Sequence, residues 1–117
     1  MTTTEIAKDF TELLKRGDSE SAAAKYNADD IVSYEAMEGP MAICRGKEAV
    51  KQKGQWWQEN HDVHGGSVEG PYVNGDQFAL RFTFDVTPKA TGQRASMDEV
   101  GVYTVKNDKI SEERFYY

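Results

Sequence analysis

The chain has 117 residues, of which 38% are hydrophobic and 29% charged, and its formal net charge is −6. This length predicts one domain with a single core, and an ordinary composition without repeats or low-complexity tracts excludes a disordered chain. No cluster of Lys or Arg interrupts the acidic balance, so we expect no nucleic acid and no anionic membrane as a partner, because both would be repelled.

The cysteine count and the absence of long apolar segments indicate the compartment. Cys44 is the single cysteine, so it cannot form an internal disulfide, which is typical of a reducing environment. No apolar run reaches the ~18 residues of a membrane span, and residues 1–10 lack the pattern of a signal peptide. The sequence therefore predicts a soluble cytoplasmic protein.

Helical signals come first along the chain and predict helices at 4–16, 19–27 and 47–60. The apolar stripe of the first segment has helical spacing and comprises Ile6, Phe10, Leu13 and Leu14. Thr2 and Glu5 have the spacing of a capping box, Gly17 is placed to end the first helix, and Asp18 is placed to cap the second.

Strand signals dominate from Val63 onward, where the apolar period changes to two. The predicted strands are 30–35, 41–45, 63–73, 76–87, 95–106 and 109–116. Along the fourth strand, the set expected to face the helices is Phe78, Leu80, Phe82, Phe84 and Val86. Asn74-Gly75 predicts a type I′ hairpin turn, and Asn107-Asp108 predicts a second turn. This order predicts an α+β protein in which helices pack on one face of a curved sheet, and residues 1–117 form one domain.

The order of elements and two motifs resemble the SnoaL-like proteins of the nuclear transport factor 2-like superfamily. The ending "VYTVKNDKISEERFYY" resembles the close of that family, with Asp108 where glycine is usual, and "RGKEAVKQ" resembles the start of its third helix. The resemblance covers essentially the whole chain. It implies a cone-shaped, curved antiparallel sheet with a mixed edge, three helices on the concave face, and a ligand between them. The family includes ketosteroid isomerases, polyketide cyclases, hydrolases and non-catalytic members, so fold alone chooses no function.

Glu35 is the acid that this resemblance singles out. Ketosteroid isomerases carry "ADD", four further residues and then the acid that moves the proton, and Ala28, Asp29 and Asp30 precede Glu35 at the same spacing. The resemblance implies that Glu35 faces the cavity as a general base. Charged residues are ordinarily exposed, so a solvated position at the edge of the sheet stays open as the alternative.

Two positions depart from the isomerase pattern. The tyrosine and the protonated aspartate that stabilise the enolate in those enzymes correspond here to Phe10 and Gly101. Neither side chain donates a hydrogen bond, and without donors a developing oxyanion loses what is usually its largest stabilising term. Steroid isomerisation by that mechanism is therefore not expected.

Glu99 and Tyr103 are the candidate substitutes. Asp98 and Glu99 must face opposite sides of a strand, and we expect Glu99 on the inner face, two residues from Gly101. Glu35, Glu99 and Tyr103 then form the predicted catalytic set. The alternative is a structural ion pair of Glu99 with an arginine, either Arg81 or Arg114.

The predicted ligand-lining residues are mostly aromatic, and they are Phe10, Tyr34, Trp56, Trp57, Phe82, Phe84, Met97, Arg114 and Tyr116. His61 and His64 form an H-x-x-H motif without a third ligand nearby, whereas metal sites usually cluster three or four. We therefore expect no metal and no cofactor, and a small apolar molecule in the cone.

Two classes of function remain open at this point. The first is a cofactor-free isomerase, cyclase or hydratase that uses carboxylate acid/base chemistry on an apolar carbonyl compound. The second is a non-catalytic ligand-binding or dimerisation module of the same fold. Val100, Val102 and Thr104 belong to a strand face that three helices on the other side cannot cover, so we expect a homodimer through the sheet.

Overall fold

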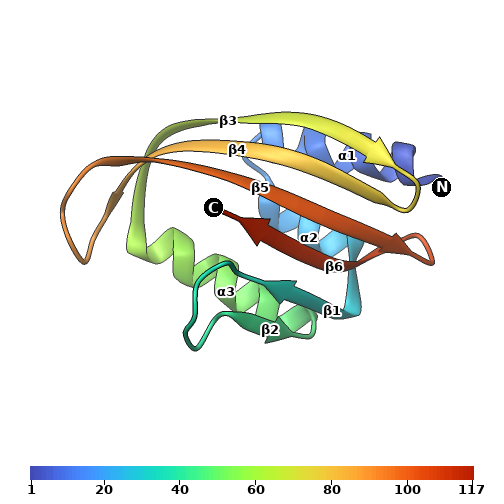
Figure 1. The fold of residues 1–117 in the computed structure, drawn as a ribbon, viewed down its shortest axis with the longest axis horizontal. Helices are drawn as coiled ribbons and strands as arrows, with labels where there is room; N and C mark the ends of the chain where they lie inside the picture. Colours follow the sequence, from blue (N-terminus) through green and yellow to red (C-terminus); the bar gives the residue numbers. More distant parts are fainter.

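The computed structural model describes residues 1–117 as three helices and one six-stranded sheet (Figure 1). The helices are α1 (Thr3–Lys15), α2 (Ser19–Tyr26) and α3 (Lys47–Asn60). The strands are β1 (Asn27–Tyr34), β2 (Ile43–Arg45), β3 (His61–Asn74), β4 (Gln77–Pro88), β5 (Ala95–Lys106) and β6 (Lys109–Tyr116). All nine predicted elements are present and in the predicted order.

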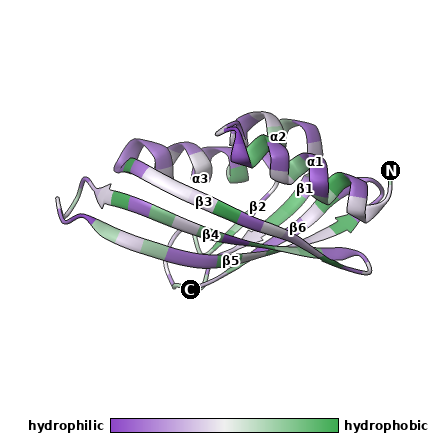
Figure 2. Ribbon diagram, turned by 90° about the horizontal axis from the view of Figure 1, so that it is seen from above, coloured by the Kyte–Doolittle hydropathy of each residue, from purple (hydrophilic) through white to green (hydrophobic).

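The sheet has the strand order β2-β1-β6-β5-β4-β3. Every neighbouring pair is antiparallel except β1 and β6, which run parallel. Figure 2 shows all three helices along one face of the curved sheet and none along the other. The predicted α+β class, with a mixed edge and helices on one face, is confirmed. None of the helices combines the length and apolar character needed to cross a membrane.

Local capping fixes where the first two helices begin and end. The Thr2 hydroxyl accepts a hydrogen bond from the Glu5 amide at 3.1 Å, and the Thr2 amide donates to the Glu5 carboxylate at 2.9 Å. Gly17 follows α1 with a φ of +76°, which glycine adopts without steric cost. Asp18 caps α2 through the amide of Ser21. The capping box and both boundary residues are as predicted.

The core lies between the helices and the inner face of the sheet. From β4, Phe78, Leu80, Phe82 and Val86 are buried there, and Phe84 packs against the same cluster half-buried. Alternate residues of β4 point to the other face, where Arg81 lies exposed. The two-residue period of a strand therefore places hydrocarbon against the helices, as predicted.

Strand boundaries differ from prediction by one to three residues in β1 to β4, and the differences in β1 and β2 have a clear cause. Strand β1 begins at Asn27, directly after α2, whereas the sequence predicted a start at residue 30. Strand β2 covers Ile43–Arg45 and omits Met41 and Ala42, which lie in the turn that leads into it. Strand β1 starts earlier because Asn27 already pairs with Ile110 of β6, and β2 starts later because the Ala42 carbonyl accepts from the amide of Glu35 within the turn.

The β3–β4 turn also differs, by one residue. Asn74 pairs with Gln77, so Gly75 and Asp76 are the two turn residues, and of these only Gly75 has a positive φ, +60°. A type I′ turn needs positive φ at both positions, so the prediction of type I′ at Asn74-Gly75 was wrong. At the β5–β6 turn the prediction holds, because Asn107 and Asp108 have φ of +51° and +63°.

The two hairpin turns generate a stability prediction. Asp108→Gly should raise the free energy of unfolding by about 0.5–1 kcal/mol, because glycine adopts positive φ without the strain that a Cβ brings. Asp76→Gly is the matched control, since Asp76 occupies a two-residue turn at negative φ and should gain nothing. Urea denaturation measures both, and equal effects of the two substitutions would contradict the argument.

Candidate active site

The strand register sets inward-facing side chains in rows across the sheet. One row comprises Ser33, Glu113, Tyr103 and Phe78. The next comprises Phe115, Gly101 and Leu80. In the third, Glu99 on β5 lies beside Phe82 on β4. Polar groups on β1, β5 and β6 thus face the same interior as the aromatic side chains of β4.

Lys53 reaches into this interior from α3 and joins several polar groups. Its Nζ donates to the Glu35 carboxylate at 2.7 Å and to the Ser33 hydroxyl. The Lys53 and Glu35 side chains are only 12% and 21% exposed. The Tyr117 hydroxyl donates to the other Glu35 oxygen at 3.0 Å, and Lys53 Nζ lies 5.1 Å from the centre of the Phe115 ring. Glu35 is thus part of an inward-facing ion pair and is not a freely solvated charge.

Two further glutamates share the environment of this ion pair. Burial, followed by the negative charges of Glu35 and Glu113, raises the pKa of Glu99 to about 7, although Lys53 opposes the rise. Burial also raises the pKa of Glu113, against the opposing effects of Lys53 and the Ser33 hydroxyl. The ammonium group of Lys53 is therefore the one positive charge that acts on these three carboxyl groups, and ionisation of all three together is disfavoured.

Tyr103 supplies a hydrogen-bond donor at the centre of the rows. Residue 101 is glycine, and a Cβ placed there would lie only 3.1 Å from the Tyr103 hydroxyl oxygen and 3.1 Å from the Phe115 ring. The phenol therefore occupies space that a side chain at position 101 would need. Burial, then the charges of Glu113, Glu99 and Glu35, raises the pKa of Tyr103 well above its usual value, so the group stays protonated.

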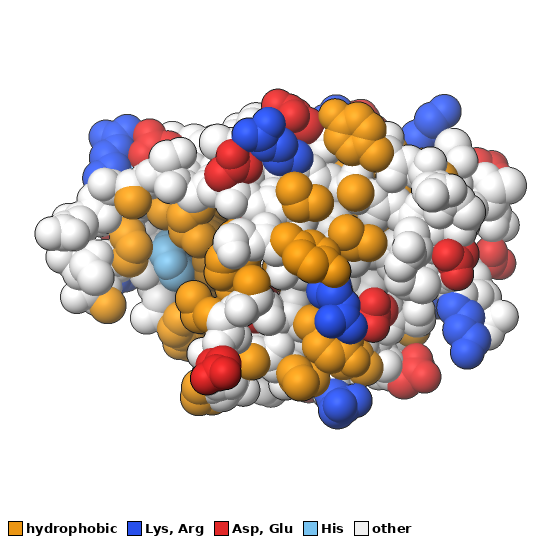
Figure 3. Space-filling model, viewed as in Figure 1, with side chains coloured by type: hydrophobic (Ala, Val, Ile, Leu, Met, Phe, Trp, Pro, Cys, Tyr) orange, Lys and Arg blue, Asp and Glu red, His pale blue; other side chains and the backbone are white.

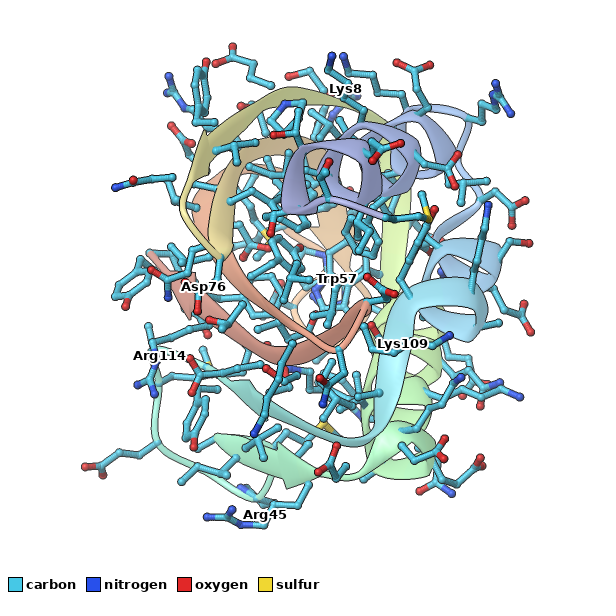
Figure 4. The ribbon with its side chains drawn as sticks, turned by 90° about the vertical axis from the view of Figure 1, so that its right-hand side faces the viewer. Lys8, Arg45, Trp57, Asp76, Lys109 and Arg114 are labelled. Atoms are coloured by element: carbon cyan, nitrogen blue, oxygen red, sulfur yellow. The ribbon has the colours of Figure 1, made fainter.

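Several predicted site residues share this interior. Glu35, Glu99 and Tyr103 converge on one region, since the charge of each glutamate acts on Tyr103. Met97 is the cross-strand partner of Phe84, whose ring lies 5.4 Å from that of Trp57. Figure 4, which looks along the molecule, shows Trp57 inside the ring formed by sheet and helices.

Four predicted ligand-lining residues lie away from the three glutamates, and a fifth, Phe10, packs against Tyr103. Tyr34, Arg114 and Tyr116 fall on the outer face of the sheet, because strand residues alternate and their neighbours take the inner positions. The Arg114 guanidinium lies 4.0 Å from the centre of the Tyr34 ring, and Tyr116 is 53% exposed. Trp56 is 46% exposed, whereas the Phe10 ring is buried with its centre 5.1 Å from that of Tyr103. Tyr34, Arg114, Tyr116 and Trp56 therefore do not line the interior that holds the glutamates, and a part of Phe10 in ligand binding stays a prediction.

The alternative of a structural Glu99–Arg pair is also wrong. Arg81 binds Asp98 at 2.7 Å on the outer face, where these two side chains are about half exposed. Arg114 pairs with Glu112 at 3.3 Å on that same face. Glu99 points to the other side of β5, where its nearest cationic influence is a lysine.

Four polar residues of the site were not predicted, namely Ser33, Lys53, Glu113 and Tyr117. Two of them carried a usable signal in the sequence. Lys53 shares a helical face with Val50 and Trp57, and a lysine among apolar residues on that face indicates an inward charge. Glu113 and Phe115 are two residues apart in β6, so their side chains point to the same face of the sheet.

The histidines and the main surface depressions lie apart from this cluster. His61 Nδ1 is 2.8 Å from the Trp57 carbonyl, and His64 Nε2 is 2.8 Å from the Thr87 hydroxyl. No group of three or more His, Cys, Asp or Glu is arranged to hold a metal ion. A depression of about 780 Å³ lies over β1, β5 and β6, and a second of about 410 Å³ lies between α1 and β3. None of the three glutamates lines either one. The three glutamates therefore lie in the buried cluster and not at these depressions.

Comparison with known proteins identifies the family. The model of the SnoaL-like domain matches residues 1–117. The chain belongs to the SnoaL-like family. No curated protein matches this SnoaL-like chain.

Solved structures agree with the family assignment. One solved structure is that of a Mesorhizobium loti protein, which is 81% identical over 100% of both chains, with a TM-score of 0.98. That protein carries the provisional name SnoaL-like polyketide cyclase, with carbohydrate phosphatase given as a second name. An NTF2-like protein of Burkholderia xenovorans is 26% identical with a TM-score of 0.73, over 97% of this chain and 87% of its own. A Catenulispora acidiphila protein with a ketosteroid isomerase-like fold, in complex with trimethylamine, is 16% identical with a TM-score of 0.74, over 99% and 87%. The last likeness shows the fold alone.

The charge cluster of this SnoaL-like protein makes a signed prediction. Glu35→Gln should lower the pKa of Glu99 from about 7, because the Glu35 charge raises it, and Lys53→Met should raise that pKa further, because the lysine lowers it. Carboxyl carbon-13 NMR across pH 4–9 measures both. Glu112→Gln, on the outer face, is the control and should leave the Glu99 titration unchanged. Shifts of the same sign in both inner variants would contradict the arrangement.

Proposed function

We propose that this SnoaL-like protein is a cofactor-free enzyme that transfers a proton on a small carbonyl compound, in the manner of an isomerase, cyclase or hydratase. The observation that carries the proposal is the contrast between two glutamates in one interior. The Glu35 carboxyl group lies 2.7 Å from the Lys53 ammonium, whereas burial raises the pKa of Glu99 to about 7. Environments that separate two carboxyl groups in this way mark an acid/base pair.

The roles follow from these two environments. Glu35 removes a proton from the carbon next to the carbonyl; the electron pair of that C–H bond forms a C=C bond, and the π pair of the carbonyl moves onto its oxygen. The hydroxyl of Tyr103 and the protonated carboxyl of Glu99 donate hydrogen bonds to the developing oxyanion. Return of the proton from Glu35 to another carbon completes an isomerisation without any cofactor.

The names of neighbours agree with this class of chemistry. The Mesorhizobium loti protein is provisionally named a polyketide cyclase. Closure of a polyketide ring by aldol chemistry begins with loss of a proton beside a carbonyl, which is the step assigned to Glu35. This agreement supports the reaction class and leaves the substrate open.

A non-catalytic binding module is the second candidate, and one observation favours it. Both oxygens of Glu35 already accept hydrogen bonds, one from Lys53 and one from Tyr117. A base in this state must release one donor before it accepts a proton from carbon. If neither donor leaves, the interior binds a ligand without changing it.

Deuterium exchange separates the two candidates without knowledge of the substrate. Proton abstraction next to a carbonyl exchanges that hydrogen in D₂O, so proton NMR of a panel of small ketones should reveal catalysed exchange. Glu35→Gln should slow it at least ~100-fold, because it removes the base and keeps the shape. Because Glu99 acts in its protonated form, the wild-type rate should fall as pH rises through about 7.

Controls make the exchange result decisive. Glu112→Gln changes a carboxylate on the outer face and should leave exchange unaltered. Ligand-observed NMR with the same ketones checks that Glu35→Gln still binds them. Binding without exchange in the wild-type protein would instead establish the binding module.

We also propose that the uncovered face of the sheet forms a twofold dimer. Figure 3 shows hydrophobic side chains gathered on this face. The exposed apolar residues that β3, β5 and β6 contribute to this face include Tyr72, Val100 and Tyr116. An apolar patch of this kind without a helix over it is typical of an interface.

The dimer predicts a measurable mass. Light scattering at micromolar concentration should give twice the 13.2 kDa of one chain. Val100→Lys, in the middle of the outer face, should shift the protein toward monomer because it buries an unpaired charge. Thr91→Lys, in the exposed β4–β5 connection, is the matched control and should leave the mass unchanged. A wild-type mass of 13.2 kDa would contradict the proposal.

A further inference from the structure

The inner site lacks positive charge relative to its carboxyl groups. Glu35, Glu99 and Glu113 face one interior, and Lys53 is the cation whose charge acts on the last two. Lys53 binds Glu35 directly. Glu113 is only 9% exposed, and no Lys or Arg nitrogen lies within 4.0 Å of its carboxylate. A buried carboxyl group without an ion-pair partner is costly to ionise, so the site has unused capacity for a cation.

Aromatic rings surround the same groups. Phe82 is the cross-strand neighbour of Glu99, and Tyr103 is that of Glu113. The Tyr103 and Phe115 rings meet edge to face, with centres 6.3 Å apart. The ammonium group of Lys53 already lies 5.1 Å from the Phe115 ring centre, so this environment accommodates a cation against an aromatic face.

We propose that the inner site binds a small methylated ammonium ion, whose charge pairs with Glu99 and Glu113 and whose methyl groups contact the aromatic rings. Methyl groups suit these walls better than N–H groups, because phenylalanine rings accept no ordinary hydrogen bond. The inference concerns the same interior as the proposed function but is independent of turnover, because the ammonium ion binds ionised Glu99 and proton transfer uses protonated Glu99. Such a ligand would therefore inhibit proton transfer.

The pH dependence of binding has a definite sign. The charges that act on Glu99 come from Glu35, which directly follows β1, Lys53 on α3 and Glu113 on β6, and together with burial they place its pKa at about 7. Tyr117 does not contribute in this range, because burial and its hydrogen bond to Glu35 raise its pKa to about 12. Glu99 is protonated below pH 7 and ionised above it, so cation affinity rises as pH increases through about 7.

Tetramethylammonium is the appropriate probe, because its charge does not change with pH. Its binding is measured by NMR titration of the full chain at pH 6 and pH 8, at constant ionic strength, beside tert-butanol, a neutral molecule of similar size. We expect tetramethylammonium to bind about tenfold more tightly at pH 8 than at pH 6, since one group with a pKa of about 7 must lose its proton. The affinity for tert-butanol should not change.

Two variants decide the assignment to this site. Glu99→Gln should abolish the pH dependence and weaken binding at pH 8 about tenfold, whereas Glu112→Gln on the outer face should behave as wild type. Chemical-shift changes at Phe82 and Phe115 locate the ligand. The proposal is overturned if tetramethylammonium binds no better than tert-butanol at pH 8, or if Glu99→Gln leaves its affinity unchanged. Neither result bears on ketone exchange, so this proposal and the proposed function can fail separately.

Discussion

The Lys53–Glu35 ion pair is the interaction on which the interior depends. A sheet covered by helices on one face would ordinarily hold only hydrocarbon there, because a charged group loses its hydration on burial. Lys53 crosses from α3 to β1 and offsets that loss for Glu35, with Ser33 completing its contacts. Its charge also moderates the pKa values of two more glutamates. Without this cation, three inward carboxyl groups could not share one interior near neutral pH.

Gly101 and Tyr103 together place a hydrogen-bond donor, the Tyr103 hydroxyl, in the interior. In the isomerase pattern an aspartate at position 101 would supply the acidic hydrogen bond, and glycine there removes it. The glycine also frees the space into which the phenol of Tyr103 leans, two residues further along the same face of β5. A missing side chain and a neighbouring large one are therefore complementary. Substitution at either position changes the packing of both, as in any tightly filled interior.

Membership of the SnoaL-like family is compatible with several functions. The proposal among them rests on the charged groups of the interior. The fold supplies a curved sheet with helices on one face, which many unrelated chemistries use. Three carboxyl groups, one lysine and a buried phenol favour proton transfer on a neutral carbonyl compound, and an anionic ligand would meet repulsion. The same surplus of carboxyl groups admits a cation when Glu99 is ionised. Protonation of one glutamate thus separates the two kinds of ligand.

The sequence by itself determined the elements, their order and the face of each long strand, because helix caps and two-residue alternation are local signals. The inward orientation of Glu35, Glu99 and Tyr103 was predicted because family spacing and alternation identify inward positions. Tertiary structure decided which groups meet: Lys53 is 18 residues from Glu35, and only the packing of α3 on β1 brings them together. It also placed Tyr34, Arg114 and Tyr116 on the outer face, because the phase of alternation at β1 and β6 is set by their parallel register. Local spacing in the sequence shows that side chains alternate between the two faces of a strand, whereas contacts between distant segments decide which set faces the interior.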